Sequence, residues 1–371
     1  MKLLFAGGGT GGHLYSGIAV AREAERLCPG VEIVFVGTEK GIEAKVLPRE
    51  GYRLIPIRVT GIKGRGLLRS LGGMVKMPAA LGSSFSLLSR EKPGAVVGIG
   101  GYASGPTVMA AAIAGYPTAI IEQNVIPGFT NKVLARFVRR IYAPMKEAVD
   151  RFPAKKKVVV TGNPIRRKVV DQALAAAKLP ESGRPLNLLV FGGSLGAKRI
   201  NQAMVEALPL LKGIAGGVSV VHQTGEAEFD ATKAAYAKAS FAADVRPFLS
   251  EMGAEYAKAD LVLCRAGAST ISELMAIGMP SILVPYPHAI YDHQTLNAKA
   301  LEARGAVRWI ADGELTGERL AKTVATLAGD PKARAALAAA AKSLGKPEAA
   351  TEIATEVLTM AGFTPTAKGG A

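Results

Sequence analysis

The segment of residues 261–285 limits the possible folds of this chain more than any other. Residues 261–264 form a continuous apolar run, which is typical of a parallel β-strand covered on both faces. Small residues follow at 266–268, then a helical pattern ended by a glycine and a proline, and then a second apolar run at 281–284. A strand, a turn, a helix and a strand in this order predict an α/β fold built on parallel strands.

The start of the helix in this segment is a candidate phosphate site. A helix N-terminus after a parallel strand offers unpaired N–H groups and the positive end of the helix dipole. We expect Ser269 or Thr270 to cap this helix. Glu273 lies about one turn further on, where a carboxylate can accept hydrogen bonds from ribose hydroxyls. Thr270 and Glu273 also have the spacing of a capping box, which needs no ligand, so both interpretations stay open.

Length and composition predict two packed domains in a reducing compartment. The chain has 371 residues, which is long for one core, and 49% of them are hydrophobic. Cys28 and Cys264 lie far apart in apolar contexts, as core residues do, and do not suggest a disulfide framework. The four histidines lack the spacing of a metal site, so we expect no dedicated metal site.

The formal net charge of +16 points to an anionic partner. Nucleic acid is disfavoured because the chain has no RNA-binding motif or zinc finger and only 6% aromatic residues. The apolar N-terminus, residues 1–6, is too short for a signal peptide. The longest apolar stretch, residues 108–121, falls short of the ~20 residues needed to span a bilayer. We therefore expect a soluble, cytoplasmic protein.

A glycine-rich loop at residues 7–13 follows the first predicted strand, residues 3–6, and opens a helix that runs to about Leu27. This is the layout of a phosphate or dinucleotide loop. The next strand ends in Gly-Thr-Glu39, an imperfect match to the dinucleotide fingerprint, so a nicotinamide enzyme is disfavoured. His13 lies at the helix start, where the dipole favours the neutral imidazole that can act as a base. Alternatively, His13 only hydrogen-bonds the loop.

Two further polar segments follow predicted strands in the first half. Residues 95–99 lead into a second glycine-rich loop, residues 100–106, and residues 118–121 lead into Glu122-Gln123-Asn124. Functional groups of α/β proteins gather at such carboxyl ends of strands, although loop capping would also explain the triplet.

Residues 51–90 contain no acidic side chain and mix basic with apolar residues. This composition suits docking on an anionic membrane surface. An ordinary core-facing helix with a basic outer face is the alternative.

The strand, glycine loop and helix pattern begins again in the second half. The Gly-Asn-Pro turn at residues 162–164 reads as an interdomain linker, and residues 187–191, 192–197 and the helix from Lys198 repeat the earlier order. We therefore expect two Rossmann-like domains with a cleft between them. The loop amides, the Ser194 hydroxyl and Arg166 can bind phosphate oxygens.

Two later segments suit the rest of a nucleotide sugar. The backbone at residues 247–249 could read the edge of a base. The polar side chains of residues 292–298, which open a helix, could face a sugar, although a capped helix start would also explain them.

Six motifs occur in the order seen in the MurG family of peptidoglycan glycosyltransferases, which the chain resembles over nearly its whole length. They lie at residues 8–13, 100–106, 122–124, 162–166, 192–197 and 264–273. The resemblance implies a GT-B fold of two Rossmann-like parallel-sheet domains with an interdomain cleft and a last helix that crosses back to the first domain. The implied division is residues 1–162 with a helix at about 341–361 for the acceptor and membrane, 163–340 for UDP-GlcNAc, and a disordered tail at 362–371.

The resemblance also implies a reaction. GlcNAc would pass from UDP-GlcNAc, with inversion, to the 4-hydroxyl of the N-acetylmuramyl sugar of lipid I, giving lipid II for the cell wall, without a metal or other cofactor. The enzyme would be peripheral on the cytoplasmic face of the cell membrane. With lipid I embedded there, the membrane interpretation of residues 62–88 is favoured.

The resemblance assigns roles to residues of this sequence. Glu273 would bind the ribose, Ser194 and Arg166 the diphosphate, the backbone of Leu249 the uracil, and Gln294 the sugar. His13, Tyr102 and Glu122 would line the acceptor side, with His13 the first choice as base and Glu122 the second. The other expected substrate contacts are Thr10, Gly11, Gly12, Asn124, Ala268, Ser269, Thr270, Ile271 and Ser272.

The chain departs from the family pattern at two places. Ile121 stands where many relatives have histidine, and the loop at 287–293 varies in length, so either His293 or Gln294 contacts the sugar. Three alternative functions stay open: a related glycosyltransferase with a diacylglycerol acceptor, a UDP-GlcNAc 2-epimerase, and a binding or regulatory protein that holds UDP-GlcNAc without turnover.

Overall fold

A computed structural model describes residues 2–57, 67–175 and 184–364. The chain forms two compact units: unit 1 comprises Met1–Ile165 and Glu348–Ala371, and unit 2 comprises Arg166–Pro347. The expected domain boundaries fell slightly earlier, at residues 162 and 340. Residues 62–66 of the expected membrane segment and 365–371 of the expected tail lie outside the described residues.

Unit 1 is built on a seven-stranded parallel sheet in the order β3-β2-β1-β4-β5-β6-β7. Its central strands are runs of buried apolar residues, as parallel strands covered on both faces require. The strands are β1 (Lys2–Gly7), β2 (Glu32–Gly37), β3 (Arg53–Pro56), β4 (Ala95–Gly100), β5 (Thr118–Ile121), β6 (Arg140–Ala143) and β7 (Val158–Val160).

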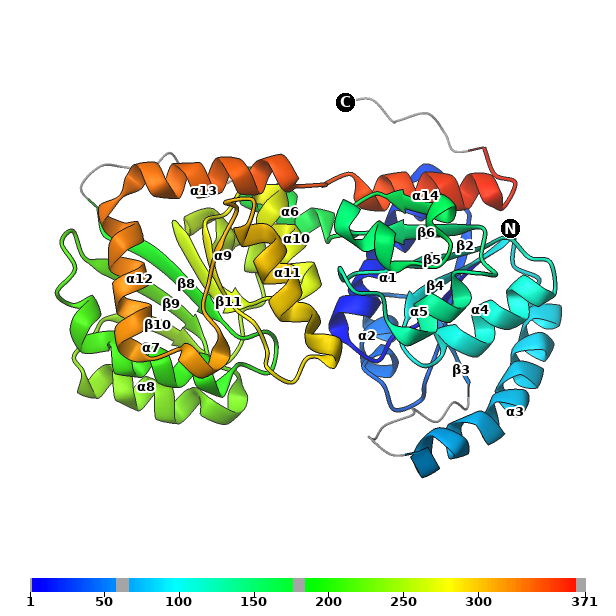
Figure 1. The fold of residues 1–371 in the computed structure, drawn as a ribbon, viewed down its shortest axis with the longest axis horizontal. Coiled ribbons are helices and arrows are strands. Elements are labelled where there is room, and N and C mark those ends of the chain that lie inside the picture. Colours follow the sequence, from blue (N-terminus) through cyan, green and yellow to red (C-terminus); the bar gives the residue numbers. More distant parts are fainter. Residues whose placement is uncertain (1, 58–66, 176–183, 365–371) are drawn as a thin grey trace. The chain divides into compact units, whose positions relative to one another are not determined.

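Helices cover both faces of this sheet (Figure 1). Leu3 and Phe5 of β1 pack in one cluster with α1 and α14, and Leu4 and Ala6 pack in the other with α3 and α4, because successive side chains of a strand point to opposite faces. The helices of unit 1 are α1 (Gly11–Leu27), α2 (Glu43–Arg49), α3 (Leu67–Glu91), α4 (Ser104–Ile113), α5 (Phe129–Leu134), the 3₁₀ helices η1 (Lys146–Arg151) and η2 (Lys155–Lys157), and α14 (Ala349–Met360).

The last helix, α14, belongs to unit 1 although it follows unit 2 in the chain. Ile353, Val357 and Leu358 are fully buried in the same cluster as α1, and the Thr351 hydroxyl donates to Glu23 Oε2 at 2.9 Å.

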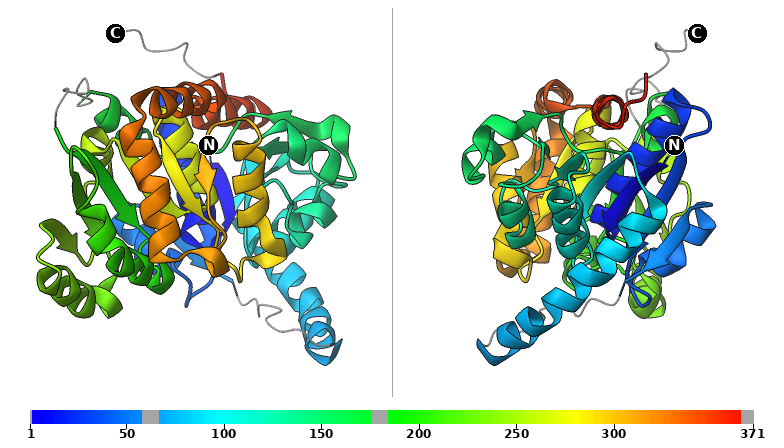
Figure 2. Two further views of the ribbon diagram at one scale, coloured as in Figure 1. Left: turned by 60° about the vertical axis from the view of Figure 1, so that its left-hand side comes forward. Right: turned by 90° about the vertical axis from the view of Figure 1, so that its right-hand side faces the viewer.

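Helix α3 is fixed to the sheet at its C-terminal end. Glu91 accepts from Lys2 Nζ at 2.6 Å and from Arg53 Nη2 at 3.0 Å, and only 4% of its side chain is exposed. From this anchor the helix projects beyond the rest of unit 1 (Figure 2). None of the described helices is long and apolar enough to cross a membrane.

Unit 2 contains a six-stranded parallel sheet in the order β10-β9-β8-β11-β12-β13. Its strands are β8 (Leu186–Phe191), β9 (Val218–Gln223), β10 (Ala243–Arg246), β11 (Leu261–Arg265), β12 (Ser281–Val284) and β13 (Arg308–Trp309). Its helices are α6 (Arg167–Ala175), α7 (Lys198–Leu211), α8 (Phe229–Lys238), α9 (Met252–Lys258), α10 (Ala268–Ile277), α11 (His293–Glu302), α12 (Gly317–Gly329), α13 (Pro331–Leu344) and the 3₁₀ helices η3 (Glu226–Glu228), η4 (Ile290–Asp292) and η5 (Asp312–Glu314).

The two strand orders confirm the predicted pair of Rossmann-like domains and locate where ligands bind in such folds. In each sheet the strand order reverses at one point, between β1 and β4 in unit 1 and between β8 and β11 in unit 2. Open α/β sheets bind ligands outside the carboxyl ends of the strands at this point. The glycine loops follow β1, β4 and β8, and the 266–268 turn follows β11, so all four lie at the reversal points.

Candidate functional site

The two glycine loops of unit 1 meet backbone to backbone. Gly8 N donates to Gly100 O at 3.0 Å. A Cβ atom added at Gly7 would lie 2.0 Å from Gly100 O, and one added at Gly101 would lie 2.4 Å from Gly8 O. Both positions also have positive φ, so only glycine allows this approach.

This contact places His13 over the second loop. Thr10 caps α1, with its Oγ1 accepting from His13 N at 3.4 Å. A Cβ at Gly100 would lie 2.9 Å from Cδ2 and 3.0 Å from Nε2 of the half-buried His13 ring. Gly11 and Gly12 form the first turn of α1, and Tyr102, 44% exposed, lies in the second loop. The structure therefore gathers His13, Tyr102 and the α1 N-terminus at one edge of the unit 1 sheet.

Glu43 braces the first glycine loop and was missed by the sequence analysis. It is 1% exposed, and its carboxylate accepts from Gly9 N at 2.9 Å, Thr38 N at 2.9 Å and Thr38 Oγ1 at 2.7 Å. Cβ atoms at Gly8, Gly37 or Gly41 would clash with it. Burial raises the pKa of Glu43, but these hydrogen bonds outweigh burial and hold the pKa below its ordinary value. The carboxylate is thus ionised and holds the loop in place.

The Glu122-Gln123-Asn124 triplet organises the loop after β5. Glu122 is 2% exposed; its Oε1 accepts from Asn124 N at 3.0 Å and Nδ2 at 3.3 Å. Its Oε2 accepts from Gly128 N at 3.1 Å and from Asn131 Nδ2 at 2.9 Å. With both oxygens bound by four donors, the geometry favours the loop-capping interpretation of Glu122 over its use as a base.

In unit 2 the loop at residues 192–197 follows β8 and precedes α7. Ser194 is exposed at its tip. Cβ atoms at Gly196 and Gly225 would lie 1.8 Å from Thr224 O and 2.2 Å from Leu195 O, so this loop lies directly on the backbone that follows β9.

The start of α10 differs from the prediction. Its N-cap is Gly267, with no side-chain cap, so the expected caps Ser269 and Thr270 and the capping box are wrong. The Ser272 hydroxyl instead donates to Ala268 O at 2.9 Å. The first N–H groups of an α-helix have no partner within it, so residues 268–270 present their amides at the carboxyl end of β11. Ile271 follows them, and its N–H donates to Gly267 O at 2.9 Å.

Glu273 forms an ion pair with Arg166 in place of the expected capping box. It is 3% exposed, and Arg166 donates to it through Nε at 2.9 Å and Nη2 at 3.2 Å. Tyr256 Oη lies 3.5 Å from Glu273 Oε2. Burial, reinforced by the Glu273 charge, raises the pKa of Tyr256 far above its ordinary value, so the phenol stays a donor. Arg166, expected at the diphosphate, thus also orients the carboxylate expected at the ribose.

Two more residues that were expected to contact the substrate form hydrogen bonds within unit 2. Leu249, 3% exposed, donates its backbone N–H to Gln223 Oε1 at 2.8 Å. Gln294 Oε1 accepts from Tyr286 N at 2.9 Å, and His293 is the first residue of α11.

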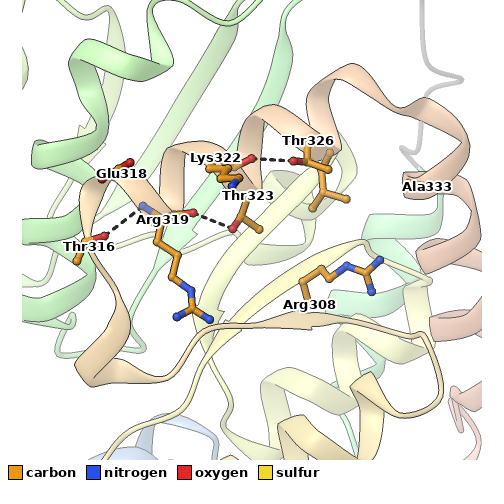
Figure 3. A pocket seen from close by; sticks show the side chains of 9 residues that line it. Arg308, Thr316, Glu318, Arg319, Lys322, Thr323, Thr326 and Ala333 are labelled. Atoms are coloured by element: carbon orange, nitrogen blue, oxygen red, sulfur yellow. Dashed lines mark hydrogen bonds between the residues drawn. The ribbon is translucent and has the colours of Figure 1, made fainter.

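A hollow of about 560 Å³ lies elsewhere on unit 2, over β13 and α12 (Figure 3). Arg308, Arg319 and Lys322 line it, but Arg319 pairs with Glu314, and none of the predicted site residues is among its lining. Within the described residues, no group of three or more His, Cys, Asp or Glu side chains is arranged to hold a metal ion.

Comparison with protein families identifies two domains in the chain. The glycosyltransferase family 28 N-terminal domain matches residues 3–143, and the glycosyltransferase family 28 C-terminal domain matches residues 187–353.

Curated relatives match nearly the whole chain. The relative from Myxococcus xanthus is 50% identical over 95% of this chain and 91% of its own, and that from Geobacter sulfurreducens is 46% identical over 96% and 98%. Both are named UDP-N-acetylglucosamine–N-acetylmuramyl-(pentapeptide) pyrophosphoryl-undecaprenol N-acetylglucosamine transferase.

Two solved structures are similar in fold to nearly the whole chain. MurG from Acinetobacter baumannii superposes with a TM-score of 0.80 at 30% identity, covering 96% of this chain and 99% of that one. A UDP-GlcNAc 2-epimerase from Neisseria meningitidis, at 16% identity and a TM-score of 0.67 over 97% and 100% of the two chains, shares the fold.

Proposed function

The chain belongs to glycosyltransferase family 28 and, within it, to the MurG family, and on this premise we propose that it transfers GlcNAc from UDP-GlcNAc to the 4-hydroxyl of the N-acetylmuramyl sugar of lipid I, giving lipid II. The observation that carries the proposal is the match to relatives of that name over nearly the whole chain. The arrangement of loops at the two reversal points of the sheets supports it.

Unit 2 supplies the groups for the nucleotide. The amides of residues 268–270, the loop at 192–197 and the Arg166 guanidinium can stabilise a diphosphate without a metal. We assign Glu273 to the ribose, since a carboxylate has room for further hydrogen bonds beside those from Arg166 and Tyr256. The backbone at Leu249 meets the uracil, and Gln294 or His293 the sugar.

Unit 1 supplies the base. The acceptor oxygen forms a bond to the anomeric carbon as the bond from that carbon to the diphosphate oxygen breaks. The hydroxyl proton passes to the base, and UDP leaves with the bonding electrons. Attack opposite the leaving group inverts the anomeric carbon. We assign the base to His13, which α1 and Gly100 hold in place, and the ordering of the loop at 122–131 to Glu122.

Glu43→Gln is expected to lower the transfer rate about tenfold at pH 7 and to leave the affinity for UDP unchanged. The amide group of glutamine cannot accept from all the donors that Gly9 and Thr38 present, which loosens the loop that carries His13. Exposed Glu39→Gln is the matched control. Initial rates and UDP titrations check this; a normal rate for Glu43→Gln would contradict it.

The lowered pKa of Glu43 determines how its contribution to the stability of the fold changes with pH. A carboxyl group whose pKa is lower in the folded state than in the unfolded state stabilises the fold at pH values above its unfolded-state pKa of about 4.3. This stabilisation is lost as the pH falls through the folded-state pKa. The difference in melting temperature between wild type and Glu43→Gln should therefore narrow in acid.

We propose that residues 62–88 dock the enzyme on an anionic membrane. The supporting observations are that α3 projects from unit 1 and that Phe85 is 37% exposed on it. Arg69→Gln with Lys76→Gln should weaken binding to vesicles containing phosphatidylglycerol about 30-fold, since each basic residue near the surface contributes about 1 kcal/mol.

The control for this prediction is Arg308→Gln with Lys322→Gln, which removes the same charge from unit 2. Co-sedimentation with vesicles measures both double variants. Equal losses would mean that net charge, and not this segment, governs binding.

A transfer assay with three acceptor conditions tests the function. UDP release and the identity of the remaining UDP-sugar are followed with UDP-GlcNAc and a short-chain lipid I analogue, with UDP-GlcNAc and a diacylglycerol, and with UDP-GlcNAc alone, all in EDTA. We expect release only with the lipid I analogue. Release only with diacylglycerol would indicate the other lipid glycosyltransferase, and conversion of UDP-GlcNAc without acceptor would indicate the epimerase. Binding without turnover in any condition would indicate a regulatory protein.

A further inference from the structure

Gln223, the last residue of β9, joins two segments of unit 2 through one buried amide. The residue is 2% exposed. Its Nε2 donates to Gly193 O at 2.9 Å, in the loop at 192–197, and its Oε1 accepts from Leu249 N at 2.8 Å. Both ends of the amide are therefore used, one on each segment.

The backbone around Gln223 makes the same connection. Gly196 and Leu195 lie against Thr224 and Gly225 so closely that a Cβ at Gly196 or Gly225 would clash with backbone oxygen. On the other side, Gly225 N donates to Pro247 O at 3.1 Å. The carboxyl end of β9 is thus a spacer between the loop after β8 and the loop after β10.

We propose that Gln223 is a positioning residue that fixes the distance between the loop at 192–197, assigned to the diphosphate, and the backbone at residues 247–249, assigned to the uracil. A pyrimidine nucleoside diphosphate is then bound as one unit. The inference rests on the donor site of the proposed function and adds a determinant to it. A fixed spacing lowers the entropy cost of ordering both segments when the ligand binds. Without the amide, each segment binds its part of the ligand independently.

The test compares uridine, UMP and UDP by calorimetric titration of the full chain. Wild type should gain affinity strongly from uridine to UDP. Gln223→Met, which keeps the volume but neither hydrogen bond, should weaken UDP about tenfold and uridine about twofold, so that the gain shrinks. Gln223→Glu keeps the acceptor for Leu249 N and loses the donor to Gly193 O, and it should weaken UDP more than uridine.

Two readouts separate positioning from mere stability. The KM for UDP-GlcNAc should rise in Gln223→Met while kcat stays within about threefold, because ground state and transition state lose the same contact. The fluorescence of Trp309, the single tryptophan, reports unfolding of unit 2. Exposed Gln202→Met on α7 is the matched control and should behave as wild type in all assays.

The outcomes that overturn the inference differ from those that overturn the function. If wild type binds UDP and folded variants keep the wild-type ratio of UDP to uridine affinity, Gln223 does not position the segments. If Gln223→Met fails to fold, the same ratio in Gln223→Glu decides. If wild type itself does not bind UDP, the proposed donor site is wrong, and the inference with it.

Discussion

His13→Ala should lower the rate of GlcNAc transfer by about 10²–10⁴-fold, the usual contribution of a general base, and leave the affinity for UDP unchanged. The expectation follows from the placement of the His13 ring by the Thr10 cap and by Gly100. The proposed function places UDP on loops of unit 2, whereas His13 lies in unit 1. Single-turnover rates with saturating donor and UDP titrations measure the two quantities separately.

His13→Gln distinguishes the base from a residue that only hydrogen-bonds the loop. Glutamine keeps hydrogen-bonding capacity but accepts no proton near pH 7, so we expect it to be as slow as alanine. A near-normal rate for His13→Gln would leave only the loop-bonding interpretation. If both His13 variants were active and Glu122→Gln were inactive yet stably folded, the base would be Glu122.

Glu273→Ala is expected to weaken UDP-GlcNAc binding about 10–100-fold. It removes a carboxylate that would accept charge-assisted hydrogen bonds from the ribose and that orients Arg166. Calorimetry gives the dissociation constant, and exposed Glu318→Ala on α12 is the control in the same unit.

Deoxyribose ligands test the ribose contact directly. Wild type should bind UDP more tightly than 2′,3′-dideoxy-UDP, and Glu273→Ala should not distinguish them. If Glu273→Ala weakened both ligands equally and kept the wild-type discrimination, Glu273 would act only through Arg166. An unchanged UDP-GlcNAc affinity would remove Glu273 from the site altogether.

The fold could be predicted because its signals are local. Apolar runs such as residues 261–264, followed by glycine and a helical pattern, occur in both halves, and each became a strand, loop and helix of a parallel sheet. The last helix was expected at about 341–361, and α14 occupies Ala349–Met360. Strands β3, β6 and β13 were not predicted, because each begins with an arginine, which interrupts the apolar run typical of a buried parallel strand.

The connections within the site could not be predicted, because they depend on residues distant in sequence. Glu43 lies 34 residues from Gly9, and Gln223 lies 30 from Gly193 and 26 from Leu249. The sequence pattern at Thr270 and Glu273 suggested a local capping box, but Arg166, 107 residues away, binds this carboxylate instead. Local spacing located the loops, whereas the tertiary structure determined which side chains hold them.

The most direct test of the account is the structure of the reaction product. The enzyme is given UDP-GlcNAc and a short-chain lipid I analogue, and the product is analysed by mass spectrometry and NMR. We expect one added GlcNAc, attached to the 4-oxygen of the N-acetylmuramyl sugar with the β configuration that inversion of the α-linked donor requires. An α linkage, attachment at another oxygen or no added sugar would contradict the account.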